Sequence, residues 1–326
     1  MLELSGPFRP PLRFDGAEQE LTFHAALALL SFGTGFDPLL LPRHRRGALE
    51  TAQFGVLGLH LAGGGLDAEA MAGFGEFQVT TVFGVDGRED REVSPGVVAS
   101  EPGPLMEYVR RVVGAVRGAG EAARAAGHRS LGGLVAALLE GNARAGRPTA
   151  AHFVGALVRA VPAFADEPSA ALPAGGGASL PLHSRACHLA AELWARFAAE
   201  REDCRFPDAA DVLPRSGAEE VTALRSMGCI EVSGGGAGAA VAAALEAQED
   251  LGGEDGTAAP ATALRAAAVA ALGAAAADCG VPAWRIARWA LDPRAEGVPG
   301  RKSGRQAGAV EWEATFGPIV RHTTAL

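Results

Sequence analysis

Apolar residues at helical spacing, interrupted by glycine and proline, limit the fold of this chain more than any other feature. The segment 18–30 shows this spacing and stops at the glycine-containing run Ser31–Phe36. A second such segment, 47–62, stops at Gly63-Gly64-Gly65. The same reasoning predicts further helices at 66–77, 104–126, 130–144, 148–160, 181–200, 218–227, 262–278 and 282–291. The sequence therefore predicts an all-α fold, which we expect to form a single helical domain over residues 1–326.

Four segments depart from the helical pattern. Val79–Phe83 is the one convincing β-branched run, so we expect it to be extended, and 86–92 is expected to be a charged loop. Segments 168–179 and 234–256 are rich in Pro, Ala and Gly, which predicts flexible excursions. Strands do not alternate with helices, and this argues against a Rossmann-type sheet.

The composition is that of a globular protein, with 48% hydrophobic and 21% charged residues. A net charge of −9 argues against broad, charge-driven binding of nucleic acid. The four cysteines are far apart and form no C-x-x-C pair, so we expect reduced thiols rather than a zinc site or disulfides. The sequence begins without the pattern of a signal peptide and shows no clear membrane span, so we expect a cytoplasmic protein with no membrane contact.

Glycine and histidine patterns give little evidence for a phosphate loop or a metal site. Gly33 and Gly35 lack the G-x-G-x-x-G and Walker spacings, so a helix-ending turn with packed phenylalanines is favoured over a phosphate cradle. Phe32 could still stack on a planar base. His183 and His188 are five residues apart, the wrong spacing for one helix face, and no metal site is predicted.

Arg185 and Glu192 are separated by two helical turns and so lie on one face of the predicted helix. Arg185 has the planar donor set that suits a phosphate, although both residues could instead face solvent or pair with neighbouring helices. Tryptophan side chains such as Trp289 pack in a protein core more often than they bind a ligand. Asp208 could simply cap a helix.

Several short motifs occur in an order that resembles the queuosine salvage protein family. His183-Ser184-Arg185-Ala186 is similar to that family's Tyr-Lys-Arg-Ala, and Ala191-Glu192-Leu193-Trp194 to its Ala-Asp-x-Trp. Phe206-Pro207-Asp208 resembles its Phe-x-Asp, and Met227-Gly228-Cys229-Ile230 its Leu-Gly-x-Leu. The ending Ile319–Thr323, which contains Arg321, resembles its Arg-x-Thr.

This resemblance implies a helical fold like that of the helix-hairpin-helix DNA glycosylases. It also implies hydrolysis of the N-glycosidic bond of queuosine 5′-phosphate, which releases queuine for salvage into tRNA modification. No metal or organic cofactor is implied, and the implied partner is a small nucleotide; the oligomeric state is left open. The residues placed at the substrate are Phe32, Arg185, Glu192, Asp208, Trp289 and Arg321.

One departure concerns the catalytic acid. The family carries an Asp-x-x-Leu-Pro motif whose aspartate is taken as catalytic, and counting back from Gly228 reaches Gly217 in its place. Hydrolysis of an N-glycosidic bond needs a carboxylate near the anomeric carbon. Glu219 and Glu220 are close in sequence and become the candidate catalytic residues. The alternative is a non-catalytic nucleotide-binding protein of the same fold that has lost this carboxylate.

Overall fold

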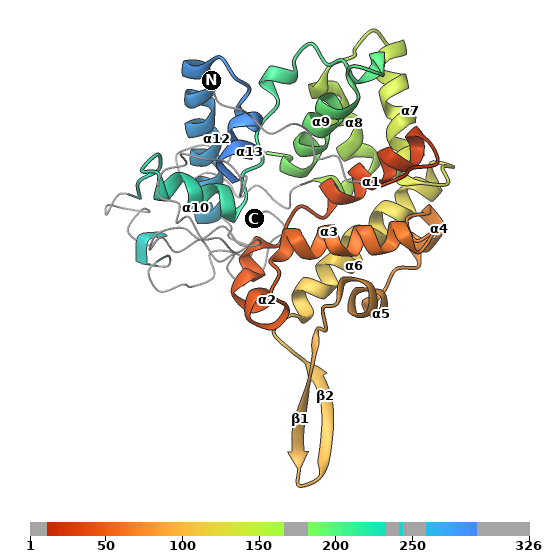
Figure 1. Cartoon of the computed structure of the whole chain (residues 1–326), viewed down its shortest axis with the longest axis vertical. Coiled ribbons are helices and arrows are strands. Elements are labelled where there is room, and N and C mark those ends of the chain that lie inside the picture. The colour runs from red at the N-terminus through yellow and green to blue at the C-terminus, as the bar shows by residue number, and fades with distance from the viewer. Residues whose placement is uncertain (1–11, 166–181, 233–240, 244, 246–258, 292–326) are drawn as a thin grey trace.

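The computed structural model describes residues 12–165, 182–232, 241–243, 245 and 259–291, and most of these residues are helical (Figure 1). The expected all-α class is confirmed. The named helices are α1 (Ala17–Leu29), α2 (Asp37–His44), α3 (Ala48–Leu61), α4 (Ala68–Ala72), α5 (Glu76–Gln78), α6 (Met106–Ala125), α7 (Leu131–Arg144), α8 (Ala150–Ala160), α9 (Ser184–Phe197), α10 (Ala218–Ser226), α12 (Ala259–Cys279) and α13 (Ala283–Leu291).

Local capping chemistry explains why several helices start where the sequence predicts. The Ser130 hydroxyl accepts the Gly133 amide hydrogen at 2.9 Å and caps α7. The Thr149 hydroxyl accepts the His152 amide hydrogen at 3.2 Å and caps α8. Each side chain satisfies one of the backbone amides that a helix start leaves without an internal partner.

The expectation for Val79–Phe83 is wrong, because this run forms a π-helical turn and not an extended segment. Val79 and Phe83 are fully buried, and the Phe83 ring lies edge-on to Phe74, with ring centroids 6.0 Å apart. A Cβ at Gly55 of α3 would lie 2.2 Å from the Phe83 ring, so only glycine admits this close approach. Tertiary packing overrides the β propensity of the run.

The charged segment expected to be a loop instead enters a β-hairpin, formed by β1 (Arg88–Ser94) and β2 (Val97–Pro102). The strands are antiparallel, with Arg91 opposite Ala99 and an irregularity between Glu92 and Ser94. Gly96 has φ of +78° in the connecting Pro-Gly turn, a conformation that glycine adopts without strain. The sequence contained this turn signal, but the strands lack the apolar alternation that would have drawn attention to it.

Two clusters of buried side chains form the hydrophobic interior. The larger is built mainly from the helices up to α9 and the segment 204–212, and the smaller mainly from α10, α12 and α13. Trp284 of α13 belongs to the larger cluster: its ring lies edge-on to Trp194 of α9, with centroids 5.8 Å apart, and its Nε1 donates to the Ala209 carbonyl at 3.0 Å. This contact ties α13 to α9.

The two segments that the sequence predicts to be flexible fall almost entirely outside the described residues. Segment 168–179 lies wholly outside them, and so does 234–256 except for 241–243 and 245.

Among the residues that the structure describes, no single helix has both the length and the apolarity to cross a membrane. Two bent helix pairs, Ala17–Leu29 with Thr34–His44 and Ala263–Cys279 with Ala283–Leu291, meet that test together by length and composition only.

Candidate functional site

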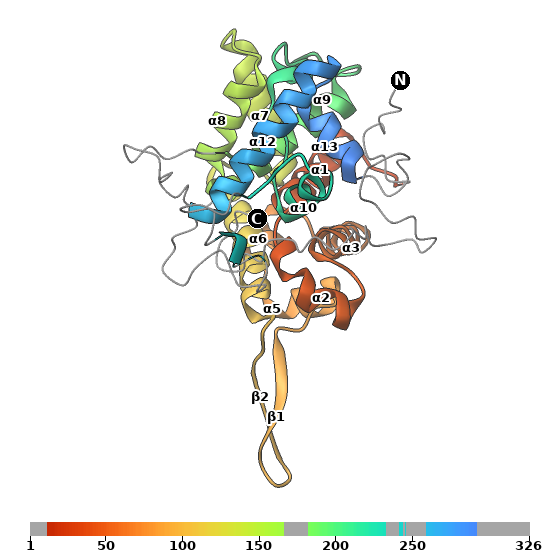
Figure 2. The same ribbon diagram turned by 90° about the vertical axis from the view of Figure 1, so that its left-hand side faces the viewer.

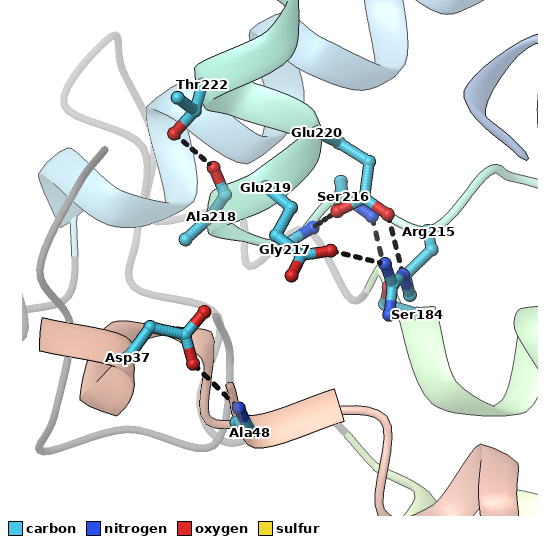
Figure 3. A network of polar contacts seen from close by, with 10 residues as sticks. All are labelled: Asp37, Ala48, Ser184, Arg215, Ser216, Gly217, Ala218, Glu219, Glu220 and Thr222. Atoms are coloured by element: carbon cyan, nitrogen blue, oxygen red, sulfur yellow. Dashed lines mark hydrogen bonds and ion pairs between the residues drawn. The ribbon is translucent and has the colours of Figure 1, made fainter. Parts of the chain in front are cut away.

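The start of α10 places an arginine against two glutamates (Figure 3). The Arg215 Nε donates to Glu220 Oε1 at 2.6 Å, and its Nη2 lies 3.4 Å from Glu219 Oε2. The Gly217 amide donates to Glu220 Oε2 at 2.8 Å. Both oxygens of Glu220 are therefore bound, and its side chain is buried with 3% exposed. Among the residues that the structure describes, Glu219 accepts only through Oε2, and 36% of its side chain is exposed.

Asp37 brings a third carboxylate to this region from α2. It is the first residue of α2, and its Oδ1 accepts the Ala48 amide hydrogen at 2.7 Å, which caps the start of α3. A Cβ at Gly47 would lie 3.1 Å from Asp37 Oδ1, so the α3 start approaches the carboxylate closely. Figure 3 shows the carboxylates of Asp37 and Glu219 directed toward one another from α2 and α10.

Burial and the charges of neighbouring carboxylates raise the pKa values of these two carboxyl groups. Burial raises the pKa of Asp37 to about 7, with the Ala48 amide opposing and the charges of Glu219 and Glu50 adding to the rise. Desolvation by the surrounding protein also raises the pKa of Glu219, although the nearby Arg215 opposes it. At neutral pH, part of the Asp37 population therefore carries a proton. The pair provides a proton donor beside a second carboxylate.

A second group of polar residues lies on α9. Glu192 accepts from Arg288 Nη1 of α13 at 2.8 Å, and burial raises the pKa of Glu192 while Arg288 opposes the rise. His188, one turn earlier on α9, has its pKa lowered to about 3, first by burial and then by the charges of Arg215 and Arg288. His188 is therefore neutral at physiological pH. The predicted binding residue Glu192 is thus held in an ion pair between two helices.

Arg185 and Phe32 are brought together, but in the interior. Arg185 is 4% exposed; its Nη2 donates to the Ala165 carbonyl at 2.6 Å and its Nη1 to the Leu29 carbonyl at 3.5 Å. The guanidinium carbon lies 5.3 Å from the centre of the Phe32 ring, and Phe32 is also 4% exposed. These contacts join α9 to the end of α1.

Two of the other predicted binding residues lie on different elements from this pair. Asp208 accepts the amide hydrogens of Ala150 at 2.7 Å and Ala151 at 3.1 Å, so its carboxylate caps the start of α8. Trp289 lies on α13 and is partly exposed. Arg321 lies outside the described residues.

The structure therefore places Glu219 and Glu220 side by side and adds Asp37, which sequence reasoning missed. The available signal was an acid directly before a proline, Asp37-Pro38, which is typical of a helix start. That signal predicts a cap and gives no reason to connect Asp37 with a helix about 180 residues later in the chain.

The described residues contain no group of three or more His, Cys, Asp or Glu side chains arranged to hold a metal ion. Comparison with protein-family models and with curated proteins gave no match to this chain.

Proposed function

We propose that this protein hydrolyses the N-glycosidic bond of queuosine 5′-phosphate and releases queuine, with Asp37 and Glu219 as the acid and base. The observation that carries the proposal is the pair of facing carboxylates, one protonated in part at neutral pH and the other beside Arg215. Carboxyl groups whose environments shift their proton affinities are the usual acid and base of glycoside hydrolysis. The choice of queuosine 5′-phosphate rests on the sequence resemblance.

The reaction needs one proton donated and one accepted. Glu219, as carboxylate, takes a proton from a water molecule as the water oxygen bonds to the anomeric carbon. Asp37, as carboxylic acid, gives its proton to the departing base as the carbon–nitrogen bond breaks. Return of a proton from Glu219 to Asp37 restores both groups. The negative charge of Glu219 also stabilises the positive charge that develops on the sugar ring.

Glu219 suits the basic role better than Glu220, the other candidate from the sequence. Glu220 accepts from Arg215 and from the Gly217 amide, and these contacts together hold the start of α10. Both oxygens of Glu220 already accept a hydrogen bond, and the side chain is buried, which limits the access of water. Glu219 makes one long contact to Arg215 and is the more exposed of the two.

The test is incubation of the purified full-length chain with queuosine 5′-monophosphate, followed by mass spectrometry for free queuine. We expect release by the wild type, and a loss of at least about 100-fold in rate for Asp37→Asn and for Glu219→Gln. Both substitutions remove the charge and keep the shape of the side chain. Asp211→Asn and Glu140→Gln, at exposed positions outside α10, are the matched controls and should retain full turnover.

Two outcomes contradict the proposal. Full turnover by Glu219→Gln removes that residue from the mechanism. No queuine release by a folded wild-type protein, together with a rise in melting temperature on adding the nucleotide, indicates the non-catalytic binding protein instead.

A further inference from the structure

The β1–β2 hairpin extends away from the helices, as both views show (Figures 1 and 2). Every side chain of β1 is exposed, and because successive side chains point to opposite faces, both faces of this strand contact solvent. The sheet of the described chain contains only these two strands. Each strand therefore has an outer edge whose backbone N–H and C=O groups are not paired within the sheet.

An isolated two-stranded ribbon is marginally stable in water, and its edges are templates for pairing with another strand. Long unpaired edges are commonly protected by charged residues or proline. The β2 edge ends at Pro102, which has no N–H to donate. The β1 edge has no proline, and what distinguishes it is the order of its charges.

The β1 sequence Arg88-Glu89-Asp90-Arg91-Glu92 is complementary to itself in antiparallel pairing. When two copies are centred on Asp90, Arg88 of each copy lies opposite Glu92 of the other. In the same register Glu89 lies opposite Arg91. Directly opposed residues share a face of the sheet, so the two-fold arrangement makes four opposite-charge pairs and one Asp90–Asp90 pair.

We propose that β1 is a homodimerisation edge, which pairs antiparallel with β1 of a second copy of this chain, centred on Asp90, to form a four-stranded sheet. The charge order selects both the partner and the register. A shift of the register by two residues in one direction places Asp90 opposite Glu92 and Arg91 opposite Arg91, which are like-charge contacts. A shift in the other direction keeps Arg88 opposite Asp90 but places Glu89 opposite Glu89. This proposal is independent of the proposed hydrolysis.

The apolar tip of the hairpin is consistent with this arrangement. Val93, Val97 and Val98 are each at least half exposed, at 50%, 54% and 62%. Antiparallel pairing about Asp90 brings the tip of each hairpin toward the base of the other. There Arg88 lies 3.9 Å from Glu76 of α5, whose neighbour Phe77 is 76% exposed. Dimerisation in this register would cover apolar groups that a single copy leaves in water.

The first experiment measures the mass of the full chain in solution by sedimentation equilibrium. We expect twice the chain mass of 33.2 kDa for the wild type. Arg88→Glu places two glutamates opposite each other twice in the dimer and should raise its dissociation constant by about tenfold or more. Adding Glu92→Arg to that variant reverses both charges and should restore the dimer. Arg144→Glu, the same change at an exposed position of α7, is the control and should have no effect.

Each alternative result overturns the proposal. A monomeric wild type means that the charges only protect a solitary ribbon. A dimer that Arg88→Glu leaves unchanged means that the copies associate through another surface. Failure of the double variant to restore the dimer means that the charge order does not set the register.

A second experiment tests the geometry directly with engineered disulfides. Asp90 lies on the proposed two-fold axis, so Cys at this position in two copies would be close enough to form a disulfide. Ser100 lies opposite Asp90 within the hairpin and marks the other edge. Asp90→Cys should give a disulfide-linked dimer on oxidation, in a chain whose exposed Cys229 and Cys279 are replaced by serine. Ser100→Cys should not form a disulfide-linked dimer. A linked dimer of Ser100→Cys and not of Asp90→Cys would assign the interface to β2.

Discussion

Arg215 donates to Glu220 at 2.6 Å, whereas its contact with Glu219 is 3.4 Å long. Because Glu220 is buried and also binds the Gly217 amide, it stabilises the start of α10. Glu219 is held less firmly and lies opposite Asp37 (Figure 3). Two neighbouring glutamates at one helix start thus have different roles, and this difference can be measured.

Glu220→Ala should lower the free energy of unfolding by about 3 kcal/mol, because it leaves Arg215 without its nearest carboxylate in a buried setting. Glu219→Ala should lower the free energy of unfolding by less than about 1 kcal/mol, since the contact between Glu219 and Arg215 is longer and more exposed. Urea denaturation monitored by circular dichroism gives both values. Equal losses for the two variants would contradict the assignment of distinct roles.

The stability contribution of Asp37 should depend on pH. Its pKa is raised from 3.8 to about 7 in the folded state, so the folded protein binds more protons than the unfolded chain between these values. Stability associated with Asp37 therefore falls as pH rises from about 4 to about 7. Asp37→Asn keeps an acceptor for the Ala48 amide but does not titrate. We expect this variant to be more stable than the wild type at pH 8 and to lose that advantage below pH 4.

The measurement for Asp37 is urea denaturation at a series of pH values, with Asp211→Asn as the control for removal of an exposed aspartate. A constant difference between Asp37→Asn and the wild type across this pH range would show that Asp37 titrates normally.

Arg185→Met should lower the free energy of unfolding by about 2 kcal/mol or more, because it removes charged donors from the Leu29 and Ala165 carbonyls in the interior. Arg144→Met, at an exposed position, should change stability by less than about 0.5 kcal/mol. If Arg185→Met leaves stability intact and instead abolishes the preference for the 5′-phosphate over the nucleoside, its role is phosphate binding.

Asp208→Ala should destabilise the protein by about 1 to 2 kcal/mol, since two amides at the start of α8 lose their acceptor. Hydrogen exchange of the Ala150 and Ala151 amides should become faster in the same variant. Asp211→Ala, a nearby exposed aspartate, serves as the control. Unchanged exchange at both amides would show that Asp208 is not the cap.

Helix positions could be predicted from the sequence because their signals are local. Ser130 and the helix after it are adjacent in the chain, and the predicted segment 130–144 agrees closely with α7 (Leu131–Arg144). The same holds for 104–126 and α6 (Met106–Ala125). Apolar spacing and the residues that begin or end a helix act within a few positions, so they can be recognised without knowledge of the remaining structure.

The sequence by itself determined the all-α class and nominated the α10 start, where Glu219 and Glu220 lie in one helical turn. The tertiary structure decided which of the two is engaged, and it brought Asp37 to face Glu219. It also made Val79–Phe83 helical, since burial of Phe83 against Gly55 outweighs the β propensity of that run. The physical reason is common to these cases: burial, repulsion between charges and close packing depend on segments that are distant in sequence, and no local pattern specifies them.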